Sequence, residues 1–547
     1  MIGLLHNQNN LTFTTRMDCT ATSISYRQTG YFTNIINDYI ERAPQLEPYY
    51  VHPVSMDGIH QAIKERQSFQ TNRGLLVEAL HEQYNSVNAS DAVKANIEKL
   101  SDDHTFTLVT AHQPHIFTGH LYFIYKIVHV IKLADELNRT LPGNHFVPVY
   151  YMGSEDADLD ELGKIYIGGE EIKWATTQQG AVGRMSTKGL DKIIDRLEGE
   201  LSIYPYGPAI IKLLRECYDP SATIQTATFR LLNKLFGQYG LVVLIPDQAR
   251  LKSAMHAIFR DDLLQQKPSE IVEHTIESLS AHYKVQATPR EINLFYLKDD
   301  IRERIVKLGE EYRVVGKGIH FTESQLLEEL QQHPERFSPN VILRGLFQET
   351  ILPNIAFIGG GGETAYWLEL KDLFQHYKVP FPVLVLRNSF LFIERKWKER
   401  INKLGIDLPQ LFKEDRLITN DIVQRDSAVQ LQLEAEIGDL ATLYDRIQDV
   451  AGKVDSTLTK HVTTLQVRAS ERLYRLEKKM LLAEKRKFSD QQNQVQSLKK
   501  NLFPRKGLQE RVDNFAPYFA RWGDDFIRMI YDHSPLFEQV FTVVEEN

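Results

Sequence analysis

Apolar residues gather in five short runs that are separated by longer stretches with helical periodicity. The runs are residues 105–110, 145–152, 240–247, 354–358 and 379–387. Short apolar runs bounded by turn residues are typical of buried strands, and an alternation of strand and helix implies parallel pairing. The pattern therefore predicts an α/β fold built on an open, doubly wound parallel sheet. Within it, the charged turn in residues 285–320 predicts an antiparallel hairpin insertion.

A different pattern follows the last of these runs. No proline lies between Pro409 and Pro504, and apolar residues recur there at alternating spacings of three and four, from Ile437 to Leu458 and, after a slip in register, onward to Ala483. This is a coiled-coil seam. A long helix needs a partner, either from its own chain, with 390–405 as the candidate, or from a second subunit. The alternative is a long helix packed along a globular face.

Together the patterns predict three parts of the chain. They are a core over residues 1–388 with inserted segments at about 155–235 and 260–340, an antiparallel coiled-coil arm over 389–504, and an aromatic-rich segment over 505–547 that packs back on the core.

Composition narrows the class of protein. The chain has 547 residues, of which 42% are hydrophobic and 25% charged, as in globular proteins. A net charge of −8 argues against a general nucleic-acid binder, and two cysteines exclude a disulfide scaffold or a cysteine-ligated metal. No apolar run is long enough to span a membrane, and the first residues turn polar too early for a signal peptide. We therefore expect a cytoplasmic protein that does not bind membranes.

In such a sheet, ligands bind where the strands end and helix N-termini begin. The first strand is followed by side chains and a turn that could hold a phosphate or a carboxylate, namely His112, Gln113, His115, Thr118, Gly119 and His120. The alternative is a structural turn in which Thr118 caps the following helix.

The second strand is followed by an acidic loop. Its Glu155, Asp156 and Asp158 could bind an amine or Mg²⁺, or act as a base. A calcium loop is excluded, because Glu161 stands at the position that requires glycine. The alternative is a helix start that is rich in acids because of the helix dipole.

The last two strands contribute a third group of candidates. Four glycines allow a close backbone approach to a ligand, although no Walker A lysine follows them. An arginine at a strand end can bind a carboxylate or a phosphate of a ligand. The alternative role of each arginine is an ion pair on the protein surface. These candidates are Gly359, Gly360, Gly361, Gly362, Glu363, Tyr366, Trp367, Arg344, Arg387 and Asn388.

These segments together resemble one family. The stretches HQPHIFTGHLYFIYK, GSEDADLDE and ERFSPNVILRGLFQETILPNIAFIGGGGETAYWLELKDLF, followed by a coiled coil and LQERVDN, resemble the bacillithiol biosynthesis cysteine-adding enzymes, the BshC family. The resemblance implies a Rossmann-like core and a homodimer formed through the coiled coil. It also implies a ligase that joins L-cysteine to glucosaminyl-malate through an amide bond, in the last step of bacillithiol synthesis.

The family is similar to class I nucleotidyl-transferring folds, in which an H-x-G-H element holds phosphates. Here the matching stretch is 117–120, in which Phe117 replaces the first histidine. The resemblance implies ATP or another nucleotide as co-substrate, and leaves a role for Mg²⁺ open. It also implies a second nucleotide pocket that would bind ADP, for which the candidates are Gln509, Glu510, Arg511 and Asn514.

The leading hypothesis is therefore a cysteine ligase without a protein-bound metal. Its expected catalytic residues are His120, Asp156, Asp158 and Glu363, and the other residues at the strand ends are expected to bind the substrates. The alternatives are a nucleotidyl transferase on the same fold and a dimeric scaffold without catalytic activity.

Overall fold

The computed structural model describes residues 17–547. The first 16 residues, with which the first predicted domain begins, lie outside the described residues. The chain divides into two compact units. Apart from single residues at the C-terminus, the first unit comprises the chain up to Phe392 together with Gly507–Glu545, and the second comprises Ile393–Lys506.

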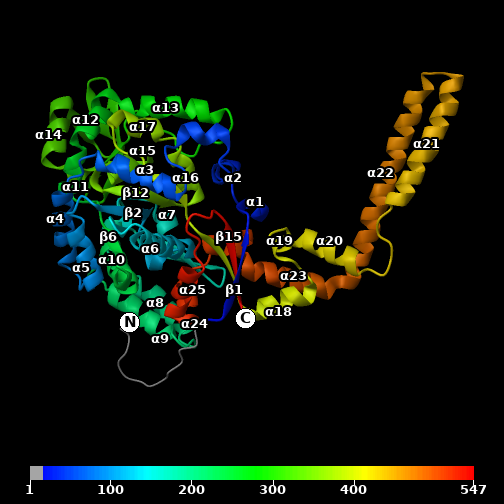
Figure 1. The fold of residues 1–547 in the computed structure, drawn as a ribbon, viewed down its shortest axis with the longest axis horizontal. Helices are drawn as coiled ribbons and strands as arrows, with labels where there is room; N and C mark the ends of the chain where they lie inside the picture. The colour runs from blue at the N-terminus through cyan, green and yellow to red at the C-terminus, as the bar shows by residue number, and fades with distance from the viewer. Residues whose placement is uncertain (1–16) are drawn as a thin grey trace. The chain divides into compact units, whose positions relative to one another are not determined.

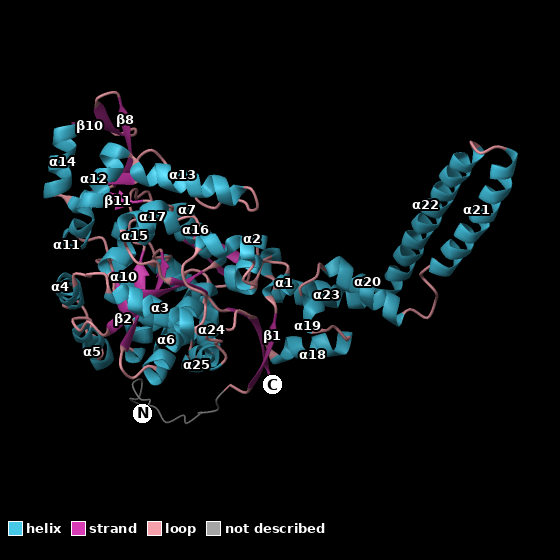
Figure 2. Cartoon of the chain, turned by 45° about the horizontal axis from the view of Figure 1, so that its top comes forward, coloured by secondary structure: helices cyan, strands magenta, loops and turns pink. Residues whose placement is uncertain are grey.

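A five-stranded parallel sheet lies at the centre of the first unit (Figures 1 and 2). In spatial order its strands are β13 (Val383–Leu386), β12 (Asn354–Gly359), β2 (Thr105–His112), β3 (His145–Met152) and β6 (Val242–Leu244). All neighbouring pairs are parallel. The chain passes outward from β2 through β3 to β6, and then crosses to the other side of β2 for β12 and β13. This is the doubly wound, Rossmann-like topology, and it confirms the predicted fold class.

The switch point of this sheet lies between β2 and β12, where the chain reverses its direction of winding. Long helices pack on the strands on either side of this point. Helix α6 (Leu121–Thr140) packs on β2 and β3, and α3 (Met56–Gln67) packs on β12 and β13. Side chains of β12 and β13 are buried along the whole of both strands, which explains their continuous apolar sequence.

The remaining elements of the first unit precede, interrupt and follow the sheet. The chain begins with β1 (Cys19–Ile24), α1 (Tyr26–Thr29), α2 (Asn34–Ile40), α4 (Arg73–Tyr84) and α5 (Asp91–Lys99). Between β3 and β6 lie α7 (Leu159–Leu162), β4 (Lys164–Ile167), β5 (Glu170–Lys173), α8 (Asp191–Leu201), α9 (Gly207–Cys217) and α10 (Ile224–Phe236). After β12 come α16 (Gly361–Trp367) and α17 (Lys371–Tyr377).

A second insertion separates β6 from β12. Its helices are α11 (Ala249–Lys252), α12 (His256–Gln265), α13 (Lys267–Ser280), α14 (Glu323–Gln332) and α15 (Val341–Ile351). Its strands are β7 (Leu294–Lys298), β8 (Ile301–Leu308), β9 (Glu311–Val314), β10 (Ile319–Thr322) and β11 (Phe337–Pro339). Strands β7 and β8 pair antiparallel across the charged turn, as the sequence predicts.

The C-terminal segment returns to the first unit. After residue 506 it forms α24 (Ala516–Trp522), α25 (Asp524–Asp532) and β15 (Phe541–Glu546). Strand β15 lies between β1 and β14 (Ser389–Ile393) in a small sheet. Of the helices in residues 17–547, none is long and apolar enough to cross a membrane.

The second unit holds a helical hairpin in place of the single long helix that the sequence predicts. Its elements are α18 (Arg395–Leu404), α19 (Leu408–Leu411), α20 (Asp415–Asp426), α21 (Glu434–Val454), α22 (Leu458–Lys485) and α23 (Ser489–Leu502). Helices α21 and α22 lie side by side (Figure 1). The chain reverses at Asp455, whose carboxylate accepts hydrogen bonds from the amide and hydroxyl of Thr457 at 2.8 Å.

The partner of α22 is therefore α21, and the expectation that residues 390–405 return along the coiled coil is wrong. Residues 390–393 belong to β14, because a run of four large apolar residues is buried there as a strand. The helix that follows, α18, packs against α23.

Candidate functional site

The candidate site lies at the carboxyl ends of β2, β3 and β12. At the end of β2 the carbonyl of His112 accepts hydrogen bonds from the amide of Gly153, at 2.8 Å, and from the hydroxyl of Tyr150, at 2.9 Å. These bonds hold the loop after β3 against the end of β2. The side chains that follow both strands are thereby brought to one edge of the sheet.

Asp156 is the centre of the first cluster at this edge. Its Oδ2 accepts a hydrogen bond from Nε2 of Gln113 at 3.1 Å and lies 3.7 Å from Nη2 of Arg344. Burial acts to raise the pKa of Asp156, but Arg344, Arg302 and Gln113 outweigh it and hold the pKa below its usual value. The carboxylate is therefore ionised at neutral pH, and it faces two guanidinium groups.

The two arginines differ in their other contacts. The guanidinium of Arg302, on β8, lies 4.0 Å from the ring centre of Phe295, and its Nε donates to the hydroxyl of Ser338 at 3.2 Å. The side chain of Arg344, on α15, is 24% exposed, and no carboxylate lies closer to it than Asp156 among the ion pairs of the described residues. The carboxylate of Asp156 is thus shared by two guanidinium groups, and one positive charge is left without a carboxylate of its own.

Glu155 turns away from this cluster into a buried ion-pair network. It pairs with Lys252, which lies 3.1 Å from Asp247, and Arg184 binds Asp247 through two bonds of 2.7 and 2.8 Å. Burial raises the pKa of Glu155, with Lys252 opposing the rise. Because its charge is already paired, Glu155 supports the loop after β3.

The charges next to Asp156 do not balance, although those of the whole group do. Glu335 acts on Arg184, so four carboxylates, of Glu155, Asp156, Asp247 and Glu335, lie among four cationic side chains, of Lys252, Arg184, Arg302 and Arg344. Beside Asp156, however, Arg302 and Arg344 place two positive charges against one carboxylate, while Glu155 is paired with Lys252. This local excess of positive charge favours an anionic ligand.

A second buried pair lies at the switch point itself. Lys126, on α6, is 1% exposed and pairs with Glu363, and it also donates to the carbonyl of Ala111 at 2.8 Å. Oε2 of Glu363 accepts a hydrogen bond from the amide of Gly360 at 2.7 Å. Glu363 therefore fills the anion position at the start of α16, which the sequence analysis assigned to a ligand.

The glycines of this turn serve packing. None of the residues 359–362 has a positive φ. A Cβ on Gly359 would lie 2.8 Å from the ring of Phe357, whereas a Cβ on Gly362 would meet nothing within 4 Å. Gly359 therefore allows the backbone to lie close to the ring of Phe357. The turn does not form a phosphate-binding loop, because the amide of Gly360 is bound to Glu363. Gly361 begins α16 and is buried.

Arg387 is bound inside the protein. Its guanidinium donates to Glu510 at 2.7 Å and to the carbonyl of Asn388 and the hydroxyl of Ser389 at 3.0 Å. Burial acts to lower the pKa of Arg387, but Glu510 outweighs it. The Asn388 side chain donates to the carbonyl of Pro535 at 2.9 Å. Of the two predicted carboxylate-binding arginines, only Arg344 is left with its charge weakly paired.

The turn before α6 has an unusual backbone. Phe117, Thr118 and Gly119 have φ values of +48°, +70° and +62°. The side-chain amide of Asn514 donates to the carbonyls of Phe117 and Gly119 at 2.9 and 2.6 Å, and the hydroxyl of Tyr218 accepts from the amide of Phe117 at 2.9 Å. These contacts hold a conformation that residues other than glycine rarely adopt.

His120 follows this turn at the N-cap of α6. Its Nδ1 lies 3.2 Å from the carbonyl of Val512, and a carbonyl can only accept, so Nδ1 carries the proton and Nε2 keeps its lone pair. Burial lowers the pKa of His120, and Lys164 and Arg511 lower it further, against the hydrogen bond that the ring donates to the carbonyl of Val512. At neutral pH the imidazole is uncharged, and Nε2 can accept a proton.

The histidines before it are neutral as well. Burial lowers the pKa of His115 to about 4, and burial with the nearby Lys126 places the pKa of His112 well below its usual value. Nε2 of His115 donates to the carbonyl of Glu161 at 2.7 Å, and its Nδ1 lies against Gly119. His115 therefore supports the turn rather than supplying positive charge.

Several predicted residues lie outside any ligand-facing arrangement. Trp367 is 1% exposed and stacks on Phe357 with 4.6 Å between ring centres, so it belongs to the core. Asp158 is exposed and caps α7 by accepting from the amide of Glu161 at 3.0 Å. Tyr366 is half-buried between the two clusters, since both Glu363 and Arg344 act on its pKa, which burial raises.

Three of the four residues of the predicted second nucleotide pocket make structural hydrogen bonds. The side-chain amide of Gln509 accepts a hydrogen bond from the main-chain amide of Phe392 at 3.0 Å and donates one to its carbonyl at 3.1 Å. A neighbouring strand would make the same pair of bonds. Glu510 binds Arg387, and Asn514 binds the turn before α6, whereas Arg511 is exposed. These contacts support the start of α6, and the second nucleotide pocket stays a prediction.

The sequence analysis missed Arg302, Lys252, Asp247 and Arg184. Asp247 is the last residue of the run 240–247 that predicts β6, so the rule that identified the other strand ends applies to it too. Arg302 had no local signal, because it comes from a hairpin inserted far from the sheet strands. Within residues 17–547 no cluster of His, Cys, Asp or Glu is arranged to hold a metal ion.

The fold defines a two-part protein, in which a Rossmann-like domain with charged side chains at the carboxyl ends of its strands is followed by a helical arm. Two family models match the chain in the same order. The Bacillithiol biosynthesis BshC N-terminal Rossmann-like domain matches residues 17–388, and the Bacillithiol biosynthesis BshC C-terminal coiled-coil domain matches residues 390–546. The chain belongs to the BshC family of bacillithiol biosynthesis proteins.

Relatives match it over almost their whole length. A protein of Flavobacterium psychrophilum is 38% identical over 95% of this chain and 99% of its own, and one of Flavobacterium johnsoniae is 38% identical over the same shares. A protein of Bacillus cytotoxicus is 25% identical over 91% of this chain and 96% of its own. All three are described as "Putative cysteine ligase BshC".

Proposed function

We propose that this protein is a ligase that joins the carboxyl group of L-cysteine to the amine of glucosaminyl-malate in the last step of bacillithiol synthesis. The observation that carries the proposal is the cluster in which Arg302 and Arg344 share Asp156 at the end of β3. It offers an anion site and a carboxylate side by side, as a substrate with carboxylates and an amine requires. The description of the relatives as cysteine ligases supports the choice of amino acid.

The surplus positive charge binds a carboxylate of the malate group. Arg344 is the main ligand, because its side chain is partly exposed and lies at 3.7 Å from Asp156, outside ordinary hydrogen-bond distance. Arg302 adds a second positive charge from the hairpin of the same insertion.

Asp156 and His120 have different roles toward the amine. Asp156 stays ionised because its pKa is held low, so it binds and orients the protonated amine and is a poor proton acceptor. Amide formation from a protonated amine releases two protons. The first passes to solvent and leaves the amine free to attack, and Nε2 of the neutral His120 takes the second as the carbon–nitrogen bond forms.

A nucleotide is the proposed co-substrate, since amide formation from a free carboxylate in water is uphill. Thr118 would hold its phosphate, because its buried hydroxyl, Oγ1, has no hydrogen-bond partner among the described residues. The main-chain amide of Leu121 is already bound to the carbonyl of Asp513 at 2.8 Å, so side chains rather than the helix start supply most donors. When bound, the nucleotide would convert the cysteine carboxylate into an activated acyl group.

The test uses purified protein, glucosaminyl-malate and cysteine, with each nucleoside triphosphate in turn, and follows the product by mass. We expect an amide product with one nucleotide, and release of AMP or ADP identifies the type of activation. A wild-type protein that forms no product with any nucleotide would overturn the proposal. His120→Ala should remove most of the activity while leaving the protein folded by circular dichroism.

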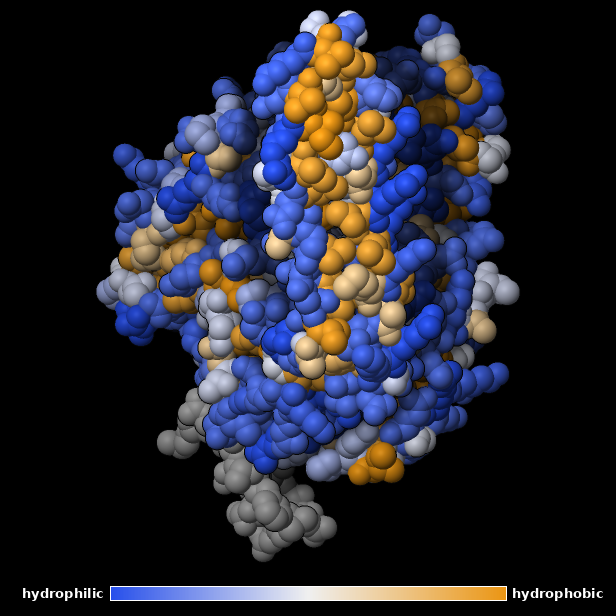
Figure 3. All heavy atoms as spheres, turned by 90° about the vertical axis from the view of Figure 1, so that its right-hand side faces the viewer, coloured by the Kyte–Doolittle hydropathy of each residue, from blue (hydrophilic) through white to orange (hydrophobic). Residues whose placement is uncertain are grey.

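We also propose that the protein is a homodimer that pairs through its arm. A continuous apolar band runs along the hairpin of α21 and α22 (Figure 3). Large apolar side chains exposed on these helices include Leu443, Ile447, Val450, Val454, Leu458, Leu465, Val467, Tyr474, Leu476 and Leu482. A stripe of this extent is costly in water unless another surface covers it, and a second copy presents the same stripe.

A further inference from the structure

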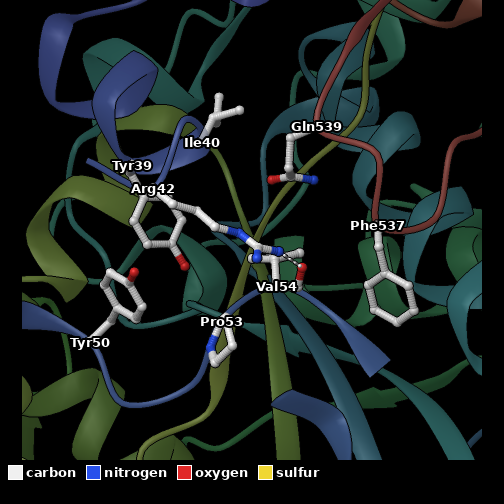
Figure 4. A pocket seen from close by; sticks show the side chains of 8 residues that line it. All are labelled: Tyr39, Ile40, Arg42, Tyr50, Pro53, Val54, Phe537 and Gln539. Atoms are coloured by element: carbon white, nitrogen blue, oxygen red, sulfur yellow. Dashed lines mark hydrogen bonds between the residues drawn. The ribbon is translucent and has the colours of Figure 1, made fainter. Parts of the chain in front are cut away.

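A hollow of about 190 Å³ lies in the first unit along the outer edge of β13 (Figure 4). Strand β13 is the last strand of its sheet, so Leu384 and Leu386 direct main-chain groups away from β12. Two side chains that line the hollow bind these groups. The hydroxyl of Tyr39 donates to the carbonyl of Leu384 at 2.7 Å, and Oε1 of Gln539 accepts from the amide of Leu386 at 3.0 Å.

Aromatic rings form two of its walls. The rings of Tyr39 and Tyr50 meet edge to face, with centres 5.3 Å apart, on one side. Phe537 lies on the other side, and the guanidinium of Arg42 extends between the two walls (Figure 4). The hollow therefore suits a flat apolar group.

The polar atoms that face the hollow are mainly donors. Nη2 of Arg42 donates to the carbonyl of Val54 at 2.9 Å, and no other contact of this guanidinium occurs within the described residues. The side-chain oxygen of Gln539 accepts from the amide of Leu386 on β13, so its Nε2 is left to donate to a ligand. Burial raises the pKa of the Tyr50 phenol, against the effect of Arg42, so its hydroxyl stays protonated and can donate.

The end of α2 places Arg42 at the hollow. Its φ is +56°, and the main-chain amides of Arg42 and Ala43 donate to the carbonyls of Tyr39 and Asp38 at 3.1 and 2.8 Å. These bonds form the usual left-handed cap that ends a helix. The cap fixes the backbone from which the guanidinium extends into the hollow.

We propose that the hollow is a binding site for a small carboxylate with a flat apolar body, separate from the carboxyl-end cluster. The carboxylate accepts from Arg42, from Nε2 of Gln539 and from Tyr50, and the apolar body lies between the tyrosine pair and Phe537. The volume corresponds to about six water molecules at ~30 Å³ each, which admits a ligand of benzoate size and excludes a nucleotide. The proposal stands independently of the ligase reaction.

The test is calorimetric titration of the full-length protein with sodium benzoate, and with benzyl alcohol as the neutral probe of the same shape. We expect saturable benzoate binding with a dissociation constant of about 1 mM, as small ligands with one charged contact give, and at least about tenfold weaker binding of benzyl alcohol. No saturable heat with benzoate, or equal binding of both probes, would overturn the proposal.

Two variants locate the site. Gln539→Glu keeps an oxygen for the amide of Leu386 but replaces the donor with a negative charge, and Arg42→Gln removes the guanidinium. Both should weaken benzoate binding at least about tenfold while leaving the melting temperature near that of the wild type. Arg313→Gln, at an exposed arginine on β9, is the matched control and should bind as the wild type does. Wild-type affinity in both hollow variants would place benzoate elsewhere and refute the assignment.

Discussion

A buried histidine in the middle of α6, His129, makes the stability of the first unit depend on pH. Nδ1 of His129 accepts from the amide of Asn388 at 3.2 Å, and its Nε2 lies 3.4 Å from the carbonyl of Leu536. The side chain is fully buried, and burial lowers its pKa to about 4. Folding thus requires the neutral ring. The stabilising effect is complete above the unfolded pKa of about 6.5 and is lost as the pH falls from there toward 4.

We therefore predict that His129→Gln reduces the acid sensitivity of the protein. Between pH 7.5 and 5.5 the wild type should lose free energy of unfolding, and the variant should lose about 1.4 kcal/mol less, because one buried histidine no longer needs to stay neutral. Denaturant unfolding at both pH values measures this difference. The exposed His60→Gln is the control, and equal acid sensitivity in the wild type and His129→Gln would contradict the prediction.

A second prediction concerns the two acids that the sequence could not tell apart. Asp156→Asn keeps the shape of the side chain but leaves Arg302 and Arg344 without their shared carboxylate, so kcat/KM for amide formation should fall about 100-fold, equal to about 3 kcal/mol. Asp158→Asn is the matched control, because asparagine also caps a helix, and it should retain wild-type kcat/KM. Equal losses in the two variants would show that the cluster is not the site.

At the scale of elements, the turn before α6 depends on a segment that follows the arm in the sequence. Two non-glycine residues with positive φ cost about 1–3 kcal/mol each, and Asn514 opposes that cost with two hydrogen bonds. The same segment receives the amide of Leu121 and holds Nδ1 of His120. The orientation of the proposed base is thus set by contacts from the C-terminal part of the chain.

Asn514→Asp tests this dependence. The substitution keeps Oδ1, which accepts from the amide of Ala516, but removes both donors to the turn. We predict a loss of about 2–4 kcal/mol in the free energy of unfolding, measured by denaturant titration, because a buried carboxylate would face two carbonyls. The kcat/KM should fall as well, and its pH profile should shift, since His120 loses its orientation. The exposed Asn501→Asp is the control, and an unchanged pH profile would argue that the turn is independent of Asn514.

Much of the first unit could be predicted from the sequence, since its strands are short apolar runs with recognisable ends. The apolar pattern predicts a long helix with a slip in register after Leu458, and in the structure the turn between α21 and α22 lies at this slip. Local pattern could not show that Glu363 caps its own helix, or that Glu155 is paired by Lys252. Those roles depend on side chains from distant segments, for which spacing along the chain carries no signal.

At the scale of the whole molecule, the apolar band on the arm predicts self-association. Val450→Glu combined with Val467→Glu places two charges on the band, and both side chains are more than half exposed in the single chain. We expect the dimer dissociation constant to rise at least about 100-fold, seen by sedimentation as a change from dimer to monomer. Ile203→Glu, at an exposed residue on the first unit, is the control. A monomeric wild type, or a dimer that persists in the double variant, would contradict the prediction.

The contact between Asn514 and the turn before α6 also has a consequence for synthesis of the protein. The ribosome must add almost 400 residues after Gly119 before Asn514 exists, since the two are 395 positions apart. At 5–20 residues per second this takes roughly 20–80 s. The strands β3, β6, β12 and β13 are added during that interval, so the complete sheet precedes the side chain of Asn514 that fixes the turn before His120. On the proposed mechanism, catalytic competence arises only after nearly the whole chain has been translated, and chains that terminate before residue 514 are inactive.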